Sequence, residues 1–221
     1  MYAERSSALP HVVAWTSVTP PGGTAKRILP DGCLDVIWSQ GAVFIAGPDT
    51  SAQLTTSPSG SRHAGLQFAV GTGAAVLGVP ADELTDRRVP LSDVLAPTQV
   101  RPLAEAENPL AALESFARRR WRTPDPTMVA VTVGARAGRP VSAIAAACGL
   151  SERQLHRRCQ PVFGYGPKTL ARILRLERAI GLARRGRPFA EVAVTTGYAD
   201  QAHLARDVRA LAGTTLTELM S

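Results

Sequence analysis

The residues of this chain that could do chemistry lie in two groups in its last third and are polar, except for one alanine. Most of them fall on the outer faces or at the ends of two predicted helices, and Lys168 lies at the start of the helix between these two. They are Glu152, Arg153, His156, Arg157, Arg158 and Lys168 in the first group, and Asp200, Gln201, Ala202, Arg206 and Arg209 in the second. Arginine can donate a bidentate pair of hydrogen bonds to guanine, glutamine can pair with adenine, and a methyl group can contact thymine. The pattern therefore indicates contact with DNA bases and phosphates. A solvated helix face that binds nothing carries similar residues. The helices and turns that position these side chains must therefore distinguish between the two interpretations.

Two copies of a helix-turn-helix pattern position these residues. Residues 141–159 read as a helix, a glycine turn and a second helix, and residues 189–213 repeat that order. A small residue, the turn glycine and two apolar contacts recur at matching places: Ala145, Gly149, Leu155 and Cys159, then Ala193, Gly197, Leu204 and Val208. The equivalent leucines are 49 residues apart, so the chain has room for two DNA-reading helices.

The ends of these helices can also be predicted. Ser151 followed by Gln154 forms a capping box, and Asp200 takes the cap in the second copy. Pro161 should end the first reading helix early. Between the copies, residues 167–184 form an amphipathic helix about 27 Å long at 1.5 Å per residue. Such a spacer could hold two reading helices about one DNA turn, roughly 34 Å, apart.

The surplus positive charge lies in the same region. The chain has a formal net charge of +7. Residues 139–221 hold thirteen Arg or Lys and six Asp or Glu, whereas residues 1–138 hold twelve of each kind. A basic C-terminal domain is the electrostatic footprint of phosphate contact, and a neutral N-terminal domain has no such reason to touch nucleic acid.

Short β-branched or aromatic runs divided by turn residues fill the first part of the chain, which is typical of a small antiparallel sheet or barrel. The predicted strands cover residues 11–18, 33–39, 42–46, 53–57 and 62–70, and predicted short helices lie within 73–84, 91–95 and 109–121. A break at Thr123 precedes Asp125, which can cap a helix at 128–135. The predicted fold class is α+β: a cupin-like small antiparallel β-sheet or barrel with flanking helices in residues 1–122, and an all-α domain with two helix-turn-helix units in residues 123–221.

Cys33 is the N-terminal residue with conceivable reactivity, because it lies between Asp31 and Asp35 at the start of a predicted strand. A sensor thiol, an alkyl acceptor, a metal ligand with His11 or His63, and a buried small residue are the open alternatives. No C-x2-C or H-x3-H spacing is present, so neither a metal site nor a cofactor is predicted. The three cysteines cannot all pair, and no structural disulfide is expected.

Trp15, Trp38 and Phe44 fall in predicted strands and, with Cys33, are the candidate ligand-binding residues. Small sheets flanked by helices commonly enclose an apolar cavity, although a role in the core is the alternative. No catalytic set is present, since the chain lacks a G-x-S-x-G elbow, a Walker loop and a Rossmann fingerprint, so an enzyme is not expected. Without an apolar run of about 18 residues or a signal-peptide pattern, the expected location is cytoplasmic, with no membrane partner.

Three runs resemble the DNA-binding domain of AraC/XylS-type bacterial transcription regulators. They are LSERQLHRR at 150–158, GYGPK at 164–168 and GYADQAHLARD at 197–207. The resemblance covers about residues 125–219 and implies seven helices, in which a central helix joins two helix-turn-helix units that read adjacent major-groove segments. Cys159 and Val208 stand where this family usually places a bulky aromatic, which implies smaller apolar plugs in both units.

Three N-terminal runs, LPDGCLD at 29–35, GP at 47–48 and GVPADELTD at 78–86, are similar to an uncharacterised sensor-type domain that often precedes this module. The implied partners are double-stranded promoter or operator DNA, a small-molecule effector, RNA polymerase in the case of an activator, and a second copy in a homodimer. The leading hypothesis is a sequence-specific transcription regulator. The alternative is a thiol-based chemical sensor or a group-accepting enzyme that uses Cys33.

Overall fold

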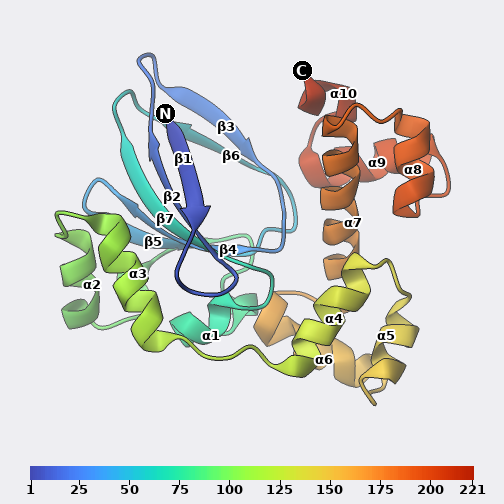
Figure 1. Cartoon of the computed structure of the whole chain (residues 1–221), viewed down its shortest axis with the longest axis horizontal. Coiled ribbons are helices and arrows are strands. Elements are labelled where there is room, and N and C mark those ends of the chain that lie inside the picture. The colour runs from blue at the N-terminus through green and yellow to red at the C-terminus, as the bar shows by residue number, and fades with distance from the viewer.

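The computed structural model describes residues 1–221 and places a β-sheet with flanking helices beside a bundle of helices (Figure 1). Its strands are β1 (Tyr2–Ser6), β2 (Val12–Val18), β3 (Thr24–Ile28), β4 (Leu34–Ser39), β5 (Ala42–Ala46), β6 (Gln53–Ser57), β7 (Arg62–Phe68) and β8 (Arg88–Pro90). Six strands form one antiparallel sheet in the order β1-β2-β7-β4-β5-β8, and β3 pairs separately with β6. No helix combines the length and apolar character needed to span a bilayer.

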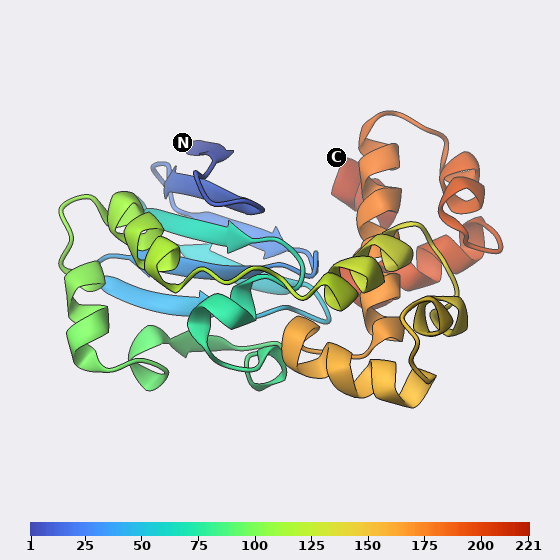
Figure 2. The ribbon, with the colours of Figure 1, turned by 60° about the horizontal axis from the view of Figure 1, so that its bottom comes forward.

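Helices cover one face of the six-stranded sheet, with α3 lying across β2, β7 and β4 (Figure 2). The helical elements of this part are α1 (Gly73–Leu77), the 3-10 turns η1 (Ala81–Glu83) and η2 (Leu91–Asp93), α2 (Pro97–Ala104) and α3 (Pro109–Arg120). Alternate residues of each strand point toward them, because successive side chains of a strand alternate between faces. Ala14, Leu66 and Val36 are cross-strand neighbours on this face and are each about 1% exposed. We call residues 1–120 the β-sheet region.

Strands β2 and β4–β7 confirm the five predicted strands to within two residues, but the sequence does not predict β1, β3, β8 or α2. All five residues of the edge strand β1 are exposed, so no apolar alternation marks it. Strand β3 reads TAKRI and β8 has three residues, too few for a periodic signal. Helix α2 has prolines at both its first position and its interior, where Pro102 argues against a helix in the sequence.

Seven further helices make up residues 126–221, which we call the helical region. They are α4 (Pro126–Arg136), α5 (Val141–Ala147), α6 (Glu152–Phe163), α7 (Pro167–Arg184), α8 (Phe189–Thr196), α9 (Gln201–Ala212) and α10 (Leu216–Met220). Asp125 caps α4 as predicted, because its side chain accepts a hydrogen bond from the Thr127 N–H at 2.8 Å. Both helix-turn-helix units and the connecting helix lie where the sequence predicts them.

Helix α7 connects two separate hydrophobic cores. Leu170, Ile173 and Leu174 in its first half are fully buried in a core that they share with α4, α5 and α6. Leu176 and Ala179 in its second half are fully buried in a core shared with α8, α9 and α10. Each helix-turn-helix unit is therefore held to one half of a single 18-residue helix.

The expectation that Pro161 ends the first reading helix early is wrong. Helix α6 continues through it to Phe163 and ends at Gly164, which has a left-handed conformation. A proline removes one backbone hydrogen bond donor, here in the last turn of the helix. Phe163 is 1% exposed, and the Gly164 N–H bonds to the Gln160 carbonyl, so packing and the glycine cap hold that last turn.

The β-sheet region contacts both helix-turn-helix units. At the first, the Thr85 hydroxyl donates to the Gly164 carbonyl at 2.9 Å. At the second, Arg27 donates to the Ala212 carbonyl at 2.8 Å, and the Ala52 N–H donates to the Leu211 carbonyl at 2.7 Å. The docked surface is therefore wide enough to reach both ends of the helical region.

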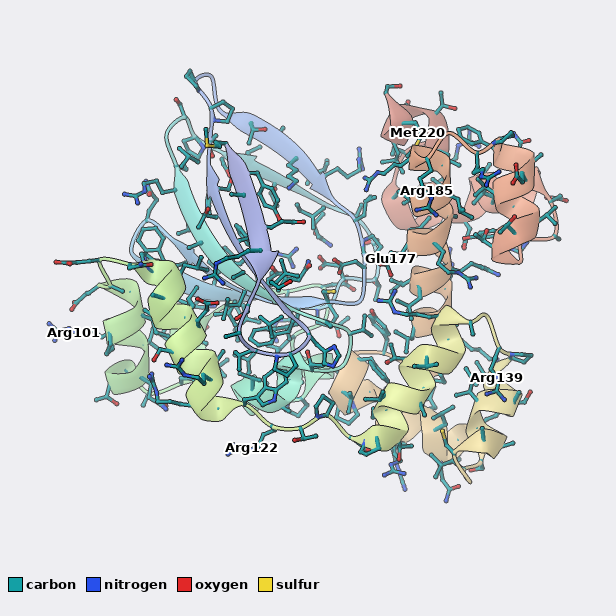
Figure 3. All side chains as sticks on the ribbon, in the orientation of Figure 1. Arg101, Arg122, Arg139, Glu177, Arg185 and Met220 are labelled. Atoms are coloured by element: carbon teal, nitrogen blue, oxygen red, sulfur yellow. The ribbon has the colours of Figure 1, made fainter.

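Between these two contacts the loop before β4 lies along α7. Cys33 packs against the first helical core, and Leu29 packs against the second. Glu177 of α7 points toward this loop (Figure 3). Burial raises the pKa of Glu177, its ion pair with Arg136 opposes that shift, and the Asp31 carboxylate adds to it.

Candidate nucleic-acid interface

Helix α6 presents a row of polar side chains to solvent. The Ser151 side chain accepts from the Gln154 N–H at 3.3 Å, and the Gln154 side chain accepts from the Ser151 N–H at 2.9 Å. This capping box fixes the start of the helix as predicted. Leu155 and Cys159 are fully buried, so the opposite face must point outward. The predicted contact residues of the first unit that lie on this outer face are all exposed: Glu152, Arg153, His156, Arg157 and Arg158.

A hollow of about 690 Å³ lies between this face of α6 and the first turn of α7. Three basic side chains, Arg153, Arg157 and Lys168, line it, with Glu152 as the acidic one, and the first turn of α7 closes its other side. His156 packs so closely on Gly166 that a Cβ there would lie 2.5 Å from the imidazole. This close approach explains the glycine at that position. The hollow concentrates positive charge and hydrogen-bond donors, which suits an anionic backbone.

Helix α9 presents the second row. The Asp200 side chain caps it by accepting from the His203 N–H at 2.6 Å, so one of its carboxylate oxygens is committed to the helix. Leu204 and Val208 are buried. The other predicted contact residues of this unit, Gln201, Ala202, Arg206 and Arg209, are all exposed. His203 accepts from the Ala199 N–H through Nδ1 at 3.3 Å, so its side chain ties the first turn of α9 to the preceding turn.

Sequence reasoning missed a buried ion cluster behind α9. The Asp207 carboxylate receives hydrogen bonds from Arg172 Nε at 2.5 Å, Arg175 Nη2 at 3.3 Å and the Tyr198 hydroxyl at 3.0 Å. Because both arginines bond to Asp207, neither is a free surface charge. The available signal was the position of Asp207, between Leu204 and Leu211 on the apolar side of the helix.

Arg158 differs from the other outward residues of α6 because it has a protein partner. Its Nη2 lies 3.8 Å from Asp125 Oδ2, and both side chains are nearly half exposed. An exposed pair at this distance contributes little to stability. This pair therefore holds the Arg158 guanidinium only weakly.

The structure does not bring the four candidate ligand-binding residues together. Trp15 and Phe44 lie in one cross-strand row, through Gly65 and Ile37, on the sheet face opposite the helices. Trp38 points to the other face, where its indole donates to the Ala104 carbonyl at 3.0 Å and its ring packs on the core. The prediction that these aromatics line one site is wrong for Trp38, because an even step from Val36 places it on the core face.

The face that carries Trp15 also holds half-buried polar groups. The Trp15 indole donates to Asp35 Oδ1 at 2.9 Å, and Gln67 Nε2 donates to Asp31 Oδ2 at 3.2 Å. Burial raises the pKa of Asp35 to about 7, and it also raises the pKa of Asp31. This part of the β-sheet region therefore carries two carboxyl groups whose surroundings disfavour the charged form of both.

Cys33 lies apart from this row, at the junction with the helical region. Burial raises the pKa of the Cys33 thiol well above its ordinary value, and the Asp31 and Asp35 carboxylates add to the shift. Because the thiolate is the reactive form, this environment keeps the sulfur protonated and unreactive. No group of three or more His, Cys, Asp or Glu side chains is arranged to hold a metal ion.

Comparisons with known protein families find a different family for each of the two parts of the chain. Residues 144–221 match a family model described as a helix-turn-helix domain, and residues 7–90 match a domain of unknown function, DUF6597. No curated protein matches the chain.

Several solved structures are similar to it. A probable AraC family transcriptional regulator from Rhodopseudomonas palustris CGA009 shares 26% identity, with 43% of this chain and 95% of that chain covered and a TM-score of 0.38. ToxT from Vibrio cholerae O395 shares 10% identity, with 95% and 97% covered and a TM-score of 0.51. The same protein bound to (E)-4-(8-methylnaphthalen-1-yl)but-3-enoic acid gives a TM-score of 0.50 at 10% identity, with 95% and 98% covered. At such identities the likeness to ToxT shows the shared two-part fold alone. The C-terminal part of the chain is therefore an AraC-type helix-turn-helix domain, and its N-terminal part is a DUF6597 domain.

Proposed function

We propose that residues 123–221 bind promoter or operator DNA in a sequence-specific way, with α6 and α9 in adjacent major-groove segments. Residues 1–122 then sense a small molecule or form a homodimer, and an activator of this kind would also contact RNA polymerase. The observation that carries this proposal is the exposure of the outward residues in both helices. In each copy the equivalent leucine, Leu155 or Leu204, is at most 1% exposed, while its polar neighbours face solvent.

The roles of individual side chains follow from their chemistry. Arg157 and Arg206 have the bidentate fork that suits guanine, and Gln201 has the amide that suits adenine. Ala202 can only contact a thymine methyl. Lys168, in the first turn of α7, would contact a phosphate. Base contacts of this kind would carry specificity, while the phosphate contacts would set the position of the protein on the duplex.

The effector class proposed for the β-sheet region follows from its charge. One ToxT structure contains an organic acid. In this chain Trp15 and Phe44 offer aromatic surface, but the raised pKa values of the nearby Asp31 and Asp35 carboxyls indicate that these surroundings disfavour negative charge, which is unfavourable for binding a carboxylate. We therefore propose an uncharged or cationic small molecule as the effector. The thiol hypothesis gains no support, since Cys33 is held protonated.

Selection of bound fragments from a random duplex library by the full-length protein tests the regulator proposal. The expected result is a recovered motif with two specific segments about one helical turn apart, bound more weakly as salt rises. Recovery of sequences without any common motif, at an affinity no higher than for scrambled duplex, would contradict it. Sedimentation velocity on the free protein and on the complex separates the monomer from the homodimer.

A further inference from the structure

We propose that Asp207 is a positioning residue, which fixes the rotation of α9 about its own axis and so decides where the base-reading side chains of the second unit point. The inference rests on the proposed function, because it concerns how α9 is presented to DNA. Asp207 itself faces the protein and would touch no base. Its side chain is 7% exposed, and it is the only buried charged residue of the helical region.

Both carboxylate oxygens of Asp207 are occupied by donors from two different elements. Arg172 on α7 donates to Oδ1, while Arg175 on α7 and Tyr198 in the turn before α9 reach Oδ2. The Arg175 guanidinium also lies 4.1 Å from the centre of the Tyr198 ring, and the edge of His203 meets that ring at 5.2 Å. The carboxylate is thus the point at which α7, the turn and α9 are joined.

Directional bonds at this point restrict a motion that apolar packing tolerates. Leu204, Val208 and Leu211 hold α9 in the apolar core that it shares with α7, but apolar contacts are not directional, so they specify the rotation of the helix less strictly than hydrogen bonds do. A charge taken out of water is costly unless its partners stay in place. Rotating α9 away from the two arginines would leave Asp207 buried and unpaired. The helix therefore has one strongly preferred rotation.

The preferred rotation of α9 determines where the side chains on its solvent-exposed face point. A helix with its side chains has a radius of about 5–6 Å, so a rotation of about 20° moves side-chain tips by about 2 Å. Specific contacts need positions held to about 0.5 Å. Gln201 and Arg206 are exposed on the same rigid helix. A loss of the Asp207 cluster would displace them beyond the range in which base hydrogen bonds can form.

The first unit lacks this device, which makes the effect specific to α9. Aligning Leu155 with Leu204 places Arg158 at the position of Asp207. Arg158 is exposed and pairs only loosely with Asp125 at 3.8 Å. Helix α6 is instead fixed at its C-terminal end, by Phe163 in the core and by the Thr85 bond to Gly164. The two copies are therefore held in place by different means.

The test uses the full-length chain with Asp207→Asn and the matched control Glu191→Gln. Both substitutions remove one negative charge from the second unit, but Glu191 is exposed on α8 and pairs only with Arg187. The probes are the duplex selected by the wild-type protein, the same duplex with the segment that depends on Arg206 scrambled, and a fully scrambled duplex. Binding is measured by anisotropy at fixed salt, alongside thermal unfolding of each variant.

We expect Asp207→Asn to bind the selected duplex at least about tenfold more weakly than Glu191→Gln does, because one or more base contacts are lost. The two variants should bind the half-scrambled duplex within about twofold of each other, since α6 is unaffected. Equal affinity of both variants for the selected duplex would overturn the inference. So would an equal loss on all three probes, which would indicate a role in folding alone.

Two further outcomes are also decisive. If Asp207→Asn does not fold, Arg172→Gln removes one of the three partners while Arg184→Gln, on an exposed residue of α7, serves as its charge control. The same duplex-specific loss is expected for Arg172→Gln, and its absence would overturn the inference. If the wild-type protein selects no duplex, the regulator proposal itself fails and this inference fails with it. A negative result for the variants alone overturns only the positioning role, because the wild-type protein still selects its duplex.

Discussion

Replacement of Asp35 by Asn should stabilise the protein, and the gain should grow with pH. Asp35 lies in β4 on the sheet face opposite the helices, where the Trp15 indole donates to its Oδ1 at 2.9 Å. Burial raises the pKa of Asp35 to about 7, from an ordinary value of 3.8, and the neighbouring Asp31 adds to the shift. Asparagine has nearly the same shape and keeps an oxygen for Trp15, but it carries no charge to desolvate.

The magnitude follows from proton linkage. Between pH 3.8 and 7 the folded state keeps a proton on Asp35 that the unfolded state has lost, so the stability of the wild-type protein falls as pH rises. Each unit of pKa difference corresponds to about 1.4 kcal/mol. The penalty removed by Asp35→Asn is therefore small at pH 4, on the order of 1.5 kcal/mol at pH 5, and at most about 4 kcal/mol at pH 8.

Urea unfolding followed by tryptophan emission, repeated at pH 4, 5 and 8, measures this gain. Asp93→Asn, on an exposed residue of the same region, is the control and should show no such trend. A free energy difference between Asp35→Asn and wild type that is constant across this range would refute the reasoning, because it would mean that Asp35 ionises normally. A difference that shrinks as pH rises would have the wrong sign and would refute it too.

Three further predictions concern the helical region. Arg157→Ala and Arg206→Ala should each cost about 1–3 kcal/mol in binding to the selected duplex, as measured by anisotropy, and unchanged affinity for both would remove them from the base-reading set. Lys168→Ala should weaken binding to all sequences alike and reduce the slope of log affinity against log salt by about 1; an unaltered slope would exclude a phosphate contact. Gly164→Ala should lower stability in thermal unfolding, because its Cβ would lie 2.4 Å from a threonine hydroxyl of the β-sheet region. Gly186→Ala has a similar positive φ but open space around it, so equal losses for the two would show that the interdomain contact contributes nothing.

The sequence predicts best the features that depend on neighbours along the chain. The Ser151 and Gln154 capping box, the Asp200 cap and the bounds of α7 are all found where the sequence predicts them. Each depends on side chains three or four positions apart, whose relation in a helix is fixed by helical geometry itself. Pro161 is the exception, because the rule that proline ends a helix ignores the packing that holds the last turn of α6.

Some features of the N-terminal part could not be predicted in this way. The exposed edge strand β1 has no apolar alternation, so only its pairing with β2 defines it. The side of the sheet on which Trp38 lies depends on register with β5 and β7 rather than on its residue type. Its separation from Trp15 and Phe44 is therefore a property of the assembled sheet.

The amino-acid sequence alone determines the α+β composition and the paired helix-turn-helix units with their outward polar rows, because these arise from periodicity and local capping. It also determines where along the chain the positive charge lies. Only the folded chain decides which charges remain available for DNA. Asp207 accepts hydrogen bonds from Arg172 and Arg175, which are 35 and 32 residues away in the sequence, and Thr85 donates to Gly164, which is 79 residues away. Partners so distant in sequence meet through the packing of whole helices and sheets, and local periodicity carries no information about that packing.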